Sequence, residues 1–180
     1  MTPLPRDAFP HAVATPRLRL RKPERGDDGL LAGLIFEAYA SRPDPLSQDR
    51  AVEFGSFAIE HWERYGFGFL VLEIAETTGS PLAIGHTGFK YADTWPGHWG
   101  EDLEAVELGY AIVPSARGCG YATEAARAVL SAAFAAFGVP RIGARCSHGN
   151  PKSADVLVRC GMREIEPTER QRRFELARPE

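Results

Sequence analysis

The chain has 180 residues, of which 44% are hydrophobic and 25% are charged. These shares are typical of folded soluble proteins, so neither a disordered nor a fibrous chain fits, and the length suits one domain. With 21 Lys and Arg against 24 Asp and Glu, the net charge of -3 provides no strong basic field. We therefore expect no nucleic-acid partner and no anionic membrane partner. The most apolar stretch, residues 125–139, is shorter than the roughly 18 residues that a membrane span needs.

The N-terminus and the cysteines favour a cytoplasmic location. Residues 1–14 contain three prolines and no unbroken apolar core, which predicts a flexible arm before a single domain over residues 15–180. Cys119, Cys146 and Cys160 are odd in number and form no Cys-x-x-Cys pair, so neither a disulfide framework nor a zinc cage is expected. The histidines show no metal-ligand spacing either, and we expect no metal.

Apolar periodicity predicts a strand, two helices and a hairpin in the first half of the chain. Leucines alternate with arginines in the strand, which is typical of a strand with one wet face. Both helices show apolar stripes at helical spacing, and Ser47 is a suitable N-cap for the second. The predicted ranges are 17–21 for the strand, 30–39 and 51–65 for the helices, and 67–75 and 82–90 for the antiparallel hairpin strands.

The second half predicts a strand, helix, strand unit, which forces parallel pairing of its strands. Residues 105–113 alternate in character, with Glu107 on the face of the small residues. Before them, residues 91–104 carry Trp95, Trp99 and an acidic cluster, which we interpret as a loop bordering a site. The fold class is therefore α/β (α+β), with a mixed, mostly antiparallel sheet flanked by helices. The remaining predicted elements are a long helix at 122–137, a strand at 142–146, a helix at 151–160 behind Asn150, and one or two strands within 162–176.

The turn before the long helix predicts a phosphate site. Its sequence is Arg117-Gly118-Cys119-Gly120-Tyr121-Ala122. A glycine-rich turn at a helix start leaves several N–H groups unpaired, and the positive end of the helix dipole adds to their attraction for phosphate oxygens. A dinucleotide fingerprint needs a small residue where this chain has Thr123, and a triphosphate loop needs Gly-Lys-Ser/Thr. The loop therefore predicts a different phosphorylated ligand.

Further motifs stand in order along about residues 15 to 165. They are Thr15-Pro-Arg-Leu-Arg-Leu-Arg, Glu107-Leu-Gly-Tyr, Gly120-Tyr-Ala-Thr-Glu-Ala, Asn150-Pro-Lys-Ser and Cys160-Gly-Met. Together with Arg117, Gly120 and Ala122, which match the pattern Gln/Arg-x-x-Gly-x-Gly/Ala, they resemble the GNAT superfamily of N-acetyltransferases. The segments are most similar to its RimJ/RimL branch.

The resemblance implies a GNAT-like sheet with a βαβ acetyl-CoA-binding core and a defined set of site residues. The loop amides would cradle the pyrophosphate, and Asn150 would hold the pantetheine arm. Ser153 would lie near the thioester. Many family members carry a tyrosine as proton donor where this chain has Leu157, so Ser153 or a water would have to substitute. The implied cofactor-binding residues are Ile112, Val113, Arg117, Gly118, Cys119, Gly120, Tyr121, Ala122, Asn150 and Ser153.

The implied reaction moves an acetyl group from acetyl-CoA to a primary amine, on a protein N-terminus or a small molecule, by direct attack in a ternary complex. The amine must first lose a proton, which at pH 7 costs about 1.4 kcal/mol for an α-amine and about 4.6 kcal/mol for a lysine. Glu107 lies on the strand that leads into the loop and is the carboxylate best placed to accept that proton. We therefore expect Glu107 as general base and Ser153 as a second catalytic residue.

Other interpretations remain open at this point. Glu107 is equally a candidate for a half-buried carboxylate with a structural partner, and Asn150 would cap its helix with or without a ligand. Cys119 at a helix start is a candidate nucleophile for a ping-pong route. Without the tyrosine, the chain is alternatively a non-catalytic acyl-CoA binding or sensing module, which would bind cofactor without amine-dependent thiol release. A homodimer is the commonest assembly for chains that associate.

Overall fold

One mixed sheet organises the residues that the structure, a computed structural model, describes: 9–40, 42, 45–75, 81–91 and 106–179. Within these residues the strand order is β1-β2-β3-β4-β5-β6-β8-β7, and every neighbouring pair is antiparallel except β5 with β6. The strands are β1 Ala12–Ala14, β2 Leu18–Arg21, β3 Phe69–Ile74, β4 Leu82–Tyr91, β5 Val106–Ile112, β6 Arg141–Ser147, β7 Arg163–Ile165 and β8 Gln171–Ala177. The helices are α1 Asp28–Tyr39, α2 Gln48–Tyr65, the 3-10 turn η1 Pro114–Ala116, α3 Tyr121–Phe137 and α4 Pro151–Arg159.

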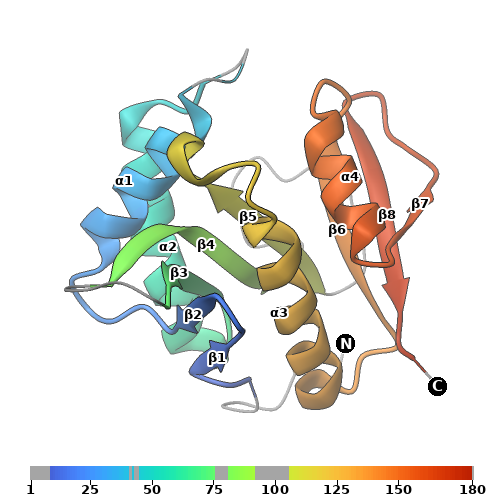
Figure 1. The fold of residues 1–180 in the computed structure, drawn as a ribbon, viewed down its shortest axis with the longest axis horizontal. Helices are drawn as coiled ribbons and strands as arrows, with labels where there is room; N and C mark the ends of the chain where they lie inside the picture. The colour runs from blue at the N-terminus through green and yellow to red at the C-terminus, as the bar shows by residue number, and fades with distance from the viewer. Residues whose placement is uncertain (1–8, 41, 43–44, 76–80, 92–105, 180) are drawn as a thin grey trace.

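The helices cover the two faces of the sheet in pairs (Figure 1). Alternation along β3 shows the division: Phe69 and Val71 pack with α1 and α2, whereas Leu70 and Leu72 belong to the larger core under α3 and α4. This layering matches the predicted fold class, a mostly antiparallel sheet flanked by helices. No helix among the described residues is long and apolar enough to span a bilayer.

The predicted helix ends are confirmed by their caps. The Ser47 hydroxyl accepts a hydrogen bond from the Arg50 N–H at 3.3 Å, as an N-cap does. Gly138 ends α3 with a φ of 64°, a backbone conformation that favours glycine. The predicted loop at 91–104 lies outside the described residues except for Tyr91, which ends β4, so Trp95 and Trp99 are not placed.

The expected flexible arm is wrong for residues 9–14. The Phe9 ring is 1% exposed and stacks on Phe137 of α3, with 5.4 Å between the ring centroids. Ala12–Ala14 then form β1 and pair with β2. Three prolines predict a loose segment, but the Phe9 side chain has a core site, and burying a phenylalanine outweighs weak local propensity. Residues 1–8 lie outside the described part of the chain.

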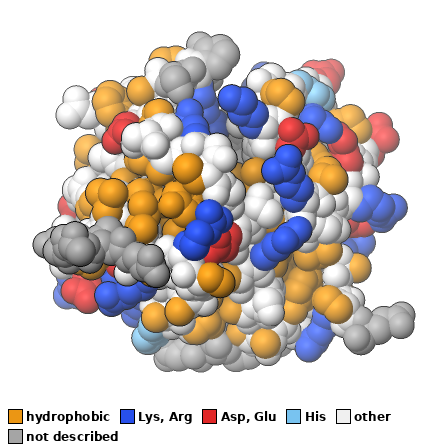
Figure 2. Space-filling model, in the orientation of Figure 1, with side chains coloured by type: hydrophobic (Ala, Val, Ile, Leu, Met, Phe, Trp, Pro, Cys, Tyr) orange, Lys and Arg blue, Asp and Glu red, His pale blue; other side chains and the backbone are white. Residues whose placement is uncertain are grey.

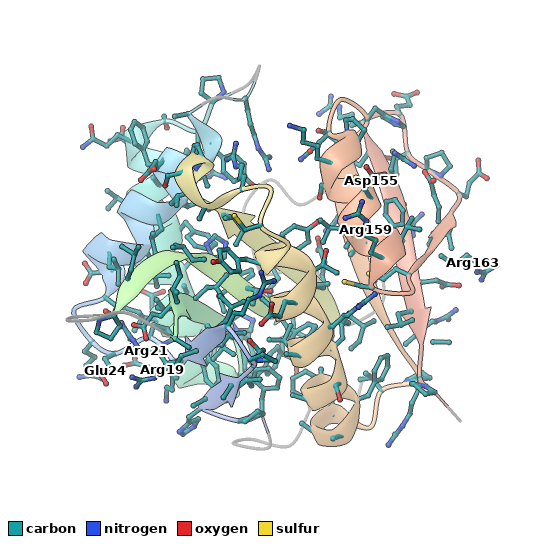
Figure 3. All side chains as sticks on the ribbon, viewed as in Figure 1. Arg19, Arg21, Glu24, Asp155, Arg159 and Arg163 are labelled. Atoms are coloured by element: carbon teal, nitrogen blue, oxygen red, sulfur yellow. The ribbon has the colours of Figure 1, made fainter. Side chains whose placement is uncertain are left out.

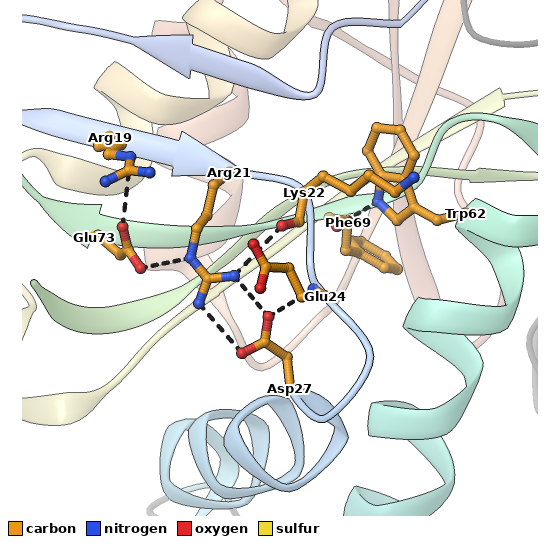
Figure 4. A network of polar contacts seen from close by, with 8 residues as sticks. All are labelled: Arg19, Arg21, Lys22, Glu24, Asp27, Trp62, Phe69 and Glu73. Atoms are coloured by element: carbon orange, nitrogen blue, oxygen red, sulfur yellow. Dashed lines mark hydrogen bonds and ion pairs between the residues drawn. The ribbon is translucent and has the colours of Figure 1, made fainter.

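An ion-pair cluster fixes β2 against β3 and the start of α1 (Figure 4). The Arg21 guanidinium donates to Glu73 at 2.7 Å and to Asp27 at 2.6 Å. The hydrogen bond from Arg21 is the main reason why the pKa of Asp27 lies below its usual value. Figure 3 shows Arg21 on the opposite side of the molecule from Asp155 and Arg159 of α4. The cluster therefore holds β2, β3 and α1 together and does not position α4.

We expect opposite effects from two glycine substitutions in the helical layer. Gly55 lies where α2 crosses α1, and an added Cβ would overlap the Asp28 carbonyl oxygen. Gly55→Ala should therefore lower the free energy of unfolding by about 1–3 kcal/mol, the usual cost of overpacking. Gly33 on α1 faces open space, so Gly33→Ala should raise the free energy of unfolding by about 0.5–1 kcal/mol. Denaturant unfolding of both variants measures this, and equal effects would contradict the packing at Gly55.

Candidate active site

The parallel strands β5 and β6 pair only briefly, and we call the stretch beyond their last pair, where the two strands part, the gap. Each strand has seven residues, yet only Glu107 with Gly143 and Leu108 with Ala144 are partners. Beyond these pairs the strands diverge (Figure 1). Because parallel strands run in the same direction, the turn after β5 and the start of α4 after β6 border the same open end. In the upper part of the view, Lys and Arg side chains lie on both sides of the boundary between β5 and β6 (Figure 2).

The open edge of β5 presents backbone groups to the gap. The Val113 N–H donates to the Ile84 carbonyl of β4 at 2.9 Å, and Thr87 on β4 donates to the Gly109 carbonyl at 3.3 Å. Successive residues of a strand direct their N–H and C=O groups to opposite sides. The backbone groups of Tyr110 and Ile112 therefore face the gap. Of these, the Ile112 carbonyl already accepts from the Arg117 side chain at 3.0 Å.

The predicted phosphate loop forms a tight turn at the start of α3. Gly118 and Gly120 are exposed and have φ values of 80° and 81°, a left-handed conformation that requires glycine-like freedom. The first-turn N–H groups of α3, which begins at Tyr121, have no partners within the helix. The Arg117 side chain also donates to the Ala38 carbonyl at 2.5 Å, which fastens the turn to the end of α1.

Two of the sequence motifs meet at this loop. Thr15 donates its hydroxyl to Glu124 in the first turn of α3, with 2.6 Å between the oxygens. The Arg17 guanidinium donates both to Glu124, at 2.6 Å, and to the Cys119 carbonyl, at 2.8 Å. Burial alone would raise the pKa of Glu124, but the Thr15 and Arg17 contacts outweigh it and lower that pKa. Both motifs are visible in the sequence, but the sequence does not reveal that the segment beginning at Thr15 supports the glycine-rich loop.

The start of α4 carries the predicted Ser153 and an unpredicted partner. Asn150 caps the helix, and its side-chain oxygen accepts from the Ser153 N–H at 3.2 Å. The Tyr110 hydroxyl of β5 lies 2.7 Å from Ser153 Oγ and 2.9 Å from the Ser153 carbonyl oxygen. Leu157, at the position where the resemblance implies a tyrosine, is 1% exposed. The alternation of β5 already placed Tyr110 opposite to Glu107, on the face that this helix covers.

Glu107 lies in a buried ion triad at the closed end of the gap. Its carboxylate accepts from Lys90 Nζ at 2.8 Å and from Arg145 Nε at 3.1 Å, with Arg145 Nη2 at 2.5 Å. Burial alone would raise the pKa of Glu107, but the hydrogen bonds and charges of Arg145 and Lys90 lower it. The triad joins β4, β5 and β6 at the point where β5 and β6 are paired.

The buried histidines pack in the core beside α2. The pKa of His61 is lowered to about 4 by burial, and its Nδ1 lies 2.8 Å from the Phe67 carbonyl oxygen. Burial lowers the pKa of His86 to about 3 where it packs between Phe54 and Phe69. Both rings are therefore neutral near pH 7. Within the part of the chain that the structure describes, no three His, Cys, Asp or Glu side chains gather as metal ligands.

The sequence matches the model of the acetyltransferase (GNAT) domain over residues 17–163, and the chain belongs to this family. This membership indicates an acetyl-CoA-dependent acyltransferase. No curated protein matches the sequence.

Several solved structures share the fold. An acetyltransferase from Agrobacterium tumefaciens is 24% identical, with a TM-score of 0.71 over 92% of this chain and 93% of its own. Mycobacterium smegmatis RimJ in complex with CoA-disulfide is 21% identical, with a TM-score of 0.69 over 96% and 90%. The ribosomal L7/L12 α-N-protein acetyltransferase RimL, in complex with coenzyme A, is 14% identical, with a TM-score of 0.69 over 92% and 97%. At these identities the likeness shows the fold.

We expect Glu107→Gln to destabilise the protein by about 3 kcal/mol at pH 7, because it removes the charge that the buried Lys90 and Arg145 side chains both contact. A carboxylate with a lowered pKa stabilises the fold above the ordinary glutamate pKa of about 4.3, and this contribution disappears as the pH falls through the lower folded value. The difference between wild type and variant should therefore shrink on acidification below about pH 4.

Denaturant unfolding at pH 7 and at acidic pH measures both effects. Glu53→Gln is the control, because Glu53 pairs with Arg50 on the surface of α2 and should change stability by less than about 0.5 kcal/mol. Equal stability of wild type and Glu107→Gln at pH 7 would refute the structural role of the triad.

Proposed function

We propose that this protein transfers the acetyl group of acetyl-CoA to a primary amine, by direct attack in a ternary complex. The proposal is carried by one observation: the gap between β5 and β6 opens between a glycine-rich helix start and Ser153. A phosphate-binding turn, an unpaired strand edge and a hydroxyl suit the three parts of an acyl-CoA: pyrophosphate, amide-containing arm and thioester. RimJ and RimL among the structural neighbours support placing the chain near that branch.

We assign different parts of acetyl-CoA to different residues along the gap. The amides of residues 117–122 would bind the pyrophosphate, and the Arg117 side chain supports the turn through Ile112 and Ala38. The arm would then pair with the backbone groups that face the gap. The Val113 N–H is bonded to β4 and the Ile112 carbonyl accepts from Arg117, so the arm would pair with the other backbone groups of Tyr110 and Ile112.

The surroundings of Glu107 bear on the class of amine. A general base is most effective when its pKa lies near the working pH, whereas two cations hold the pKa of Glu107 below its ordinary value. The base role of Glu107 stays a prediction, and its contacts support the structural alternative. An acceptor that loses its proton readily needs the least help, so we propose an α-amine, of pKa about 8, rather than a lysine side chain.

We expect calorimetry with acetyl-CoA to show binding, and a thiol reagent to detect coenzyme A release when an amine is added. In a panel of amino acids, short peptides and polyamines at pH 7, α-amines should react faster than lysine side chains. The rate with lysine side chains should rise about tenfold per pH unit up to their pKa of about 10.4. Binding heat without amine-dependent thiol release would instead identify the sensing module, and absence of both would refute the proposal.

We expect Glu124→Ala to weaken acetyl-CoA binding roughly tenfold, equal to about 1.4 kcal/mol. Without this carboxylate, Thr15 and Arg17 no longer hold the loop through the first turn of α3. Calorimetric titration measures the affinity, and Glu60→Ala, which removes an exposed carboxylate from α2, is the control. Unchanged affinity in Glu124→Ala would mean that the loop keeps its shape without the brace.

A further inference from the structure

Arg42 follows α1, whose end lies beside the turn that leaves β5 (Figure 1). The Arg42 N–H donates to the Tyr39 carbonyl at 3.0 Å, and the guanidinium stacks on the Tyr39 ring, with 3.6 Å between its central carbon and the ring centroid. Arg117 of the glycine-rich loop donates to the Ala38 carbonyl and so fastens this end of α1 to the loop. These contacts hold the Arg42 guanidinium at the open end of the gap.

The charge of Arg42 acts on groups of both strands that border the gap. Burial raises the pKa of the Tyr110 hydroxyl on β5 and of the Cys146 thiol on β6, and the positive charge of Arg42 opposes both shifts. The Tyr110 hydroxyl lies 2.7 Å from Ser153 Oγ, at the start of α4. Because the interaction between charges falls with distance, the guanidinium lies near this part of the gap. The thioester of the proposed function belongs in the same place.

Arg42 differs from the neighbouring arginine in its partners. Arg172, whose charge also acts on Cys146, donates through two nitrogens to Glu164, each at 2.7 Å. Arg42 instead contacts the Tyr39 ring, and no carboxylate among the described residues forms an ion pair with it. A cation placed in this way at the entrance of a site attracts an anionic ligand.

We propose that Arg42 selects an anionic acceptor: its guanidinium binds a carboxylate that lies a few bonds from the α-amine to be acetylated. This inference rests on the proposed function and deepens it, because it names the class of substrate. The α-carboxylate of an amino acid and the side chain of an acidic residue next to a peptide N-terminus share this chemistry. A guanidinium presents its N–H groups as a planar fork that matches a carboxylate with two parallel hydrogen bonds.

The phosphates of acetyl-CoA are the other anions that enter the gap. The proposed function assigns the pyrophosphate to the amides of residues 117–122, and the pantetheine arm separates it from the thioester. Beside that loop, the contacts of Thr15 and Arg17 outweigh burial and lower the pKa of Glu124. The charge of Arg42 acts instead near the start of α4. The position of Arg42 therefore favours the acceptor over the cofactor.

Matched pairs of acceptors test the inference. One pair is an amino acid and its amide, and the other is two amidated peptides that carry aspartate or asparagine after the same N-terminal residue. Coenzyme A release gives kcat and KM, with KM expressed as unprotonated amine because a nearby carboxylate also changes the amine pKa. Arg42→Gln removes the charge, and Arg42→Lys keeps the charge without the planar fork. The control is Arg64→Gln, because Arg64 also lies over a tyrosine ring, that of Tyr65 at the end of α2.

We expect the wild type to have a KM about tenfold lower for the carboxylate member of at least one pair, the usual effect of a hydrogen bond to a charged group. The pair that shows the preference identifies the source of the carboxylate. Arg42→Gln should abolish the preference and change the KM of the neutral member less than about twofold, whereas Arg42→Lys should keep part of it. High salt should weaken the preference. Arg64→Gln should match wild type, and Arg42→Gln should bind acetyl-CoA as wild type does.

Equal KM values for both members of both pairs in the wild type would overturn the inference, and so would polyamines as the best acceptors. An equal loss for neutral and anionic acceptors in Arg42→Gln, or weaker acetyl-CoA binding there, would also overturn it. If Arg42→Gln does not fold, Arg42→Lys and the salt dependence of the wild-type preference decide. Failure of the wild type to release coenzyme A with any amine would refute the proposed function itself. Turnover without a preference for carboxylates would refute only this inference.

Discussion

The short parallel pairing of β5 with β6 is the constraint on which the site depends. Glu107 and Leu108 pair with Gly143 and Ala144, and the strands then part. The closed end is held by a carboxylate between two cations, Lys90 and Arg145, so that charge and backbone pairing coincide there. If the pairing continued to the strand ends, the edge of β5 would be filled by β6. The candidate site thus lies where β5 and β6 stop pairing within the sheet.

Each border of the gap is held by a contact between residues distant in the sequence. Arg17 and Thr15 brace the loop through Glu124, and Arg117 ties the same turn to α1. On the other border, the Tyr110 hydroxyl of β5 reaches across to Ser153, 43 positions along the chain, while Asn150 caps α4 locally. These contacts are polar and directional, whereas the layers behind them are apolar. Such an arrangement fixes the position of polar groups on a scaffold whose stability comes from elsewhere.

Much of the fold is predictable from the sequence, because local apolar periodicity and capping residues indicate where helices and strands begin and end. The long stripe of α3, the cap at Ser47 and the parallel pairing implied by a helix between two strands are all found. Contacts that depend on the third dimension were not predictable. Phe9 gave no periodic signal and yet fills a core site, and the two cations around Glu107 come from strands whose register no local pattern reveals.

For the site, the residue types near the gap followed from motifs, but their partners did not. The motifs predict Ser153 and the glycine turn as site residues, whereas for Tyr110 the sequence predicts only a place in a motif and on the strand face opposite Glu107. Its position opposite Glu107 on β5 follows from period-two alternation, but its contact with Ser153 requires knowing that α4 covers that face. The outcome for Glu107 also rests on partners: the same carboxylate is a base in open surroundings and a structural anion between two cations.

The bond between Thr15 and Glu124 joins positions 109 residues apart, and Phe9 reaches as far as Phe137. During synthesis on the ribosome, the N-terminal strands therefore emerge long before α3 exists to receive them. The leucines of β2 are fully buried in the folded protein, but they stay exposed to solvent until α3 has been made. Contacts of such high sequence separation slow folding and prolong the exposure of apolar surface. β1 and β2 are therefore made before α3 and settle only after it.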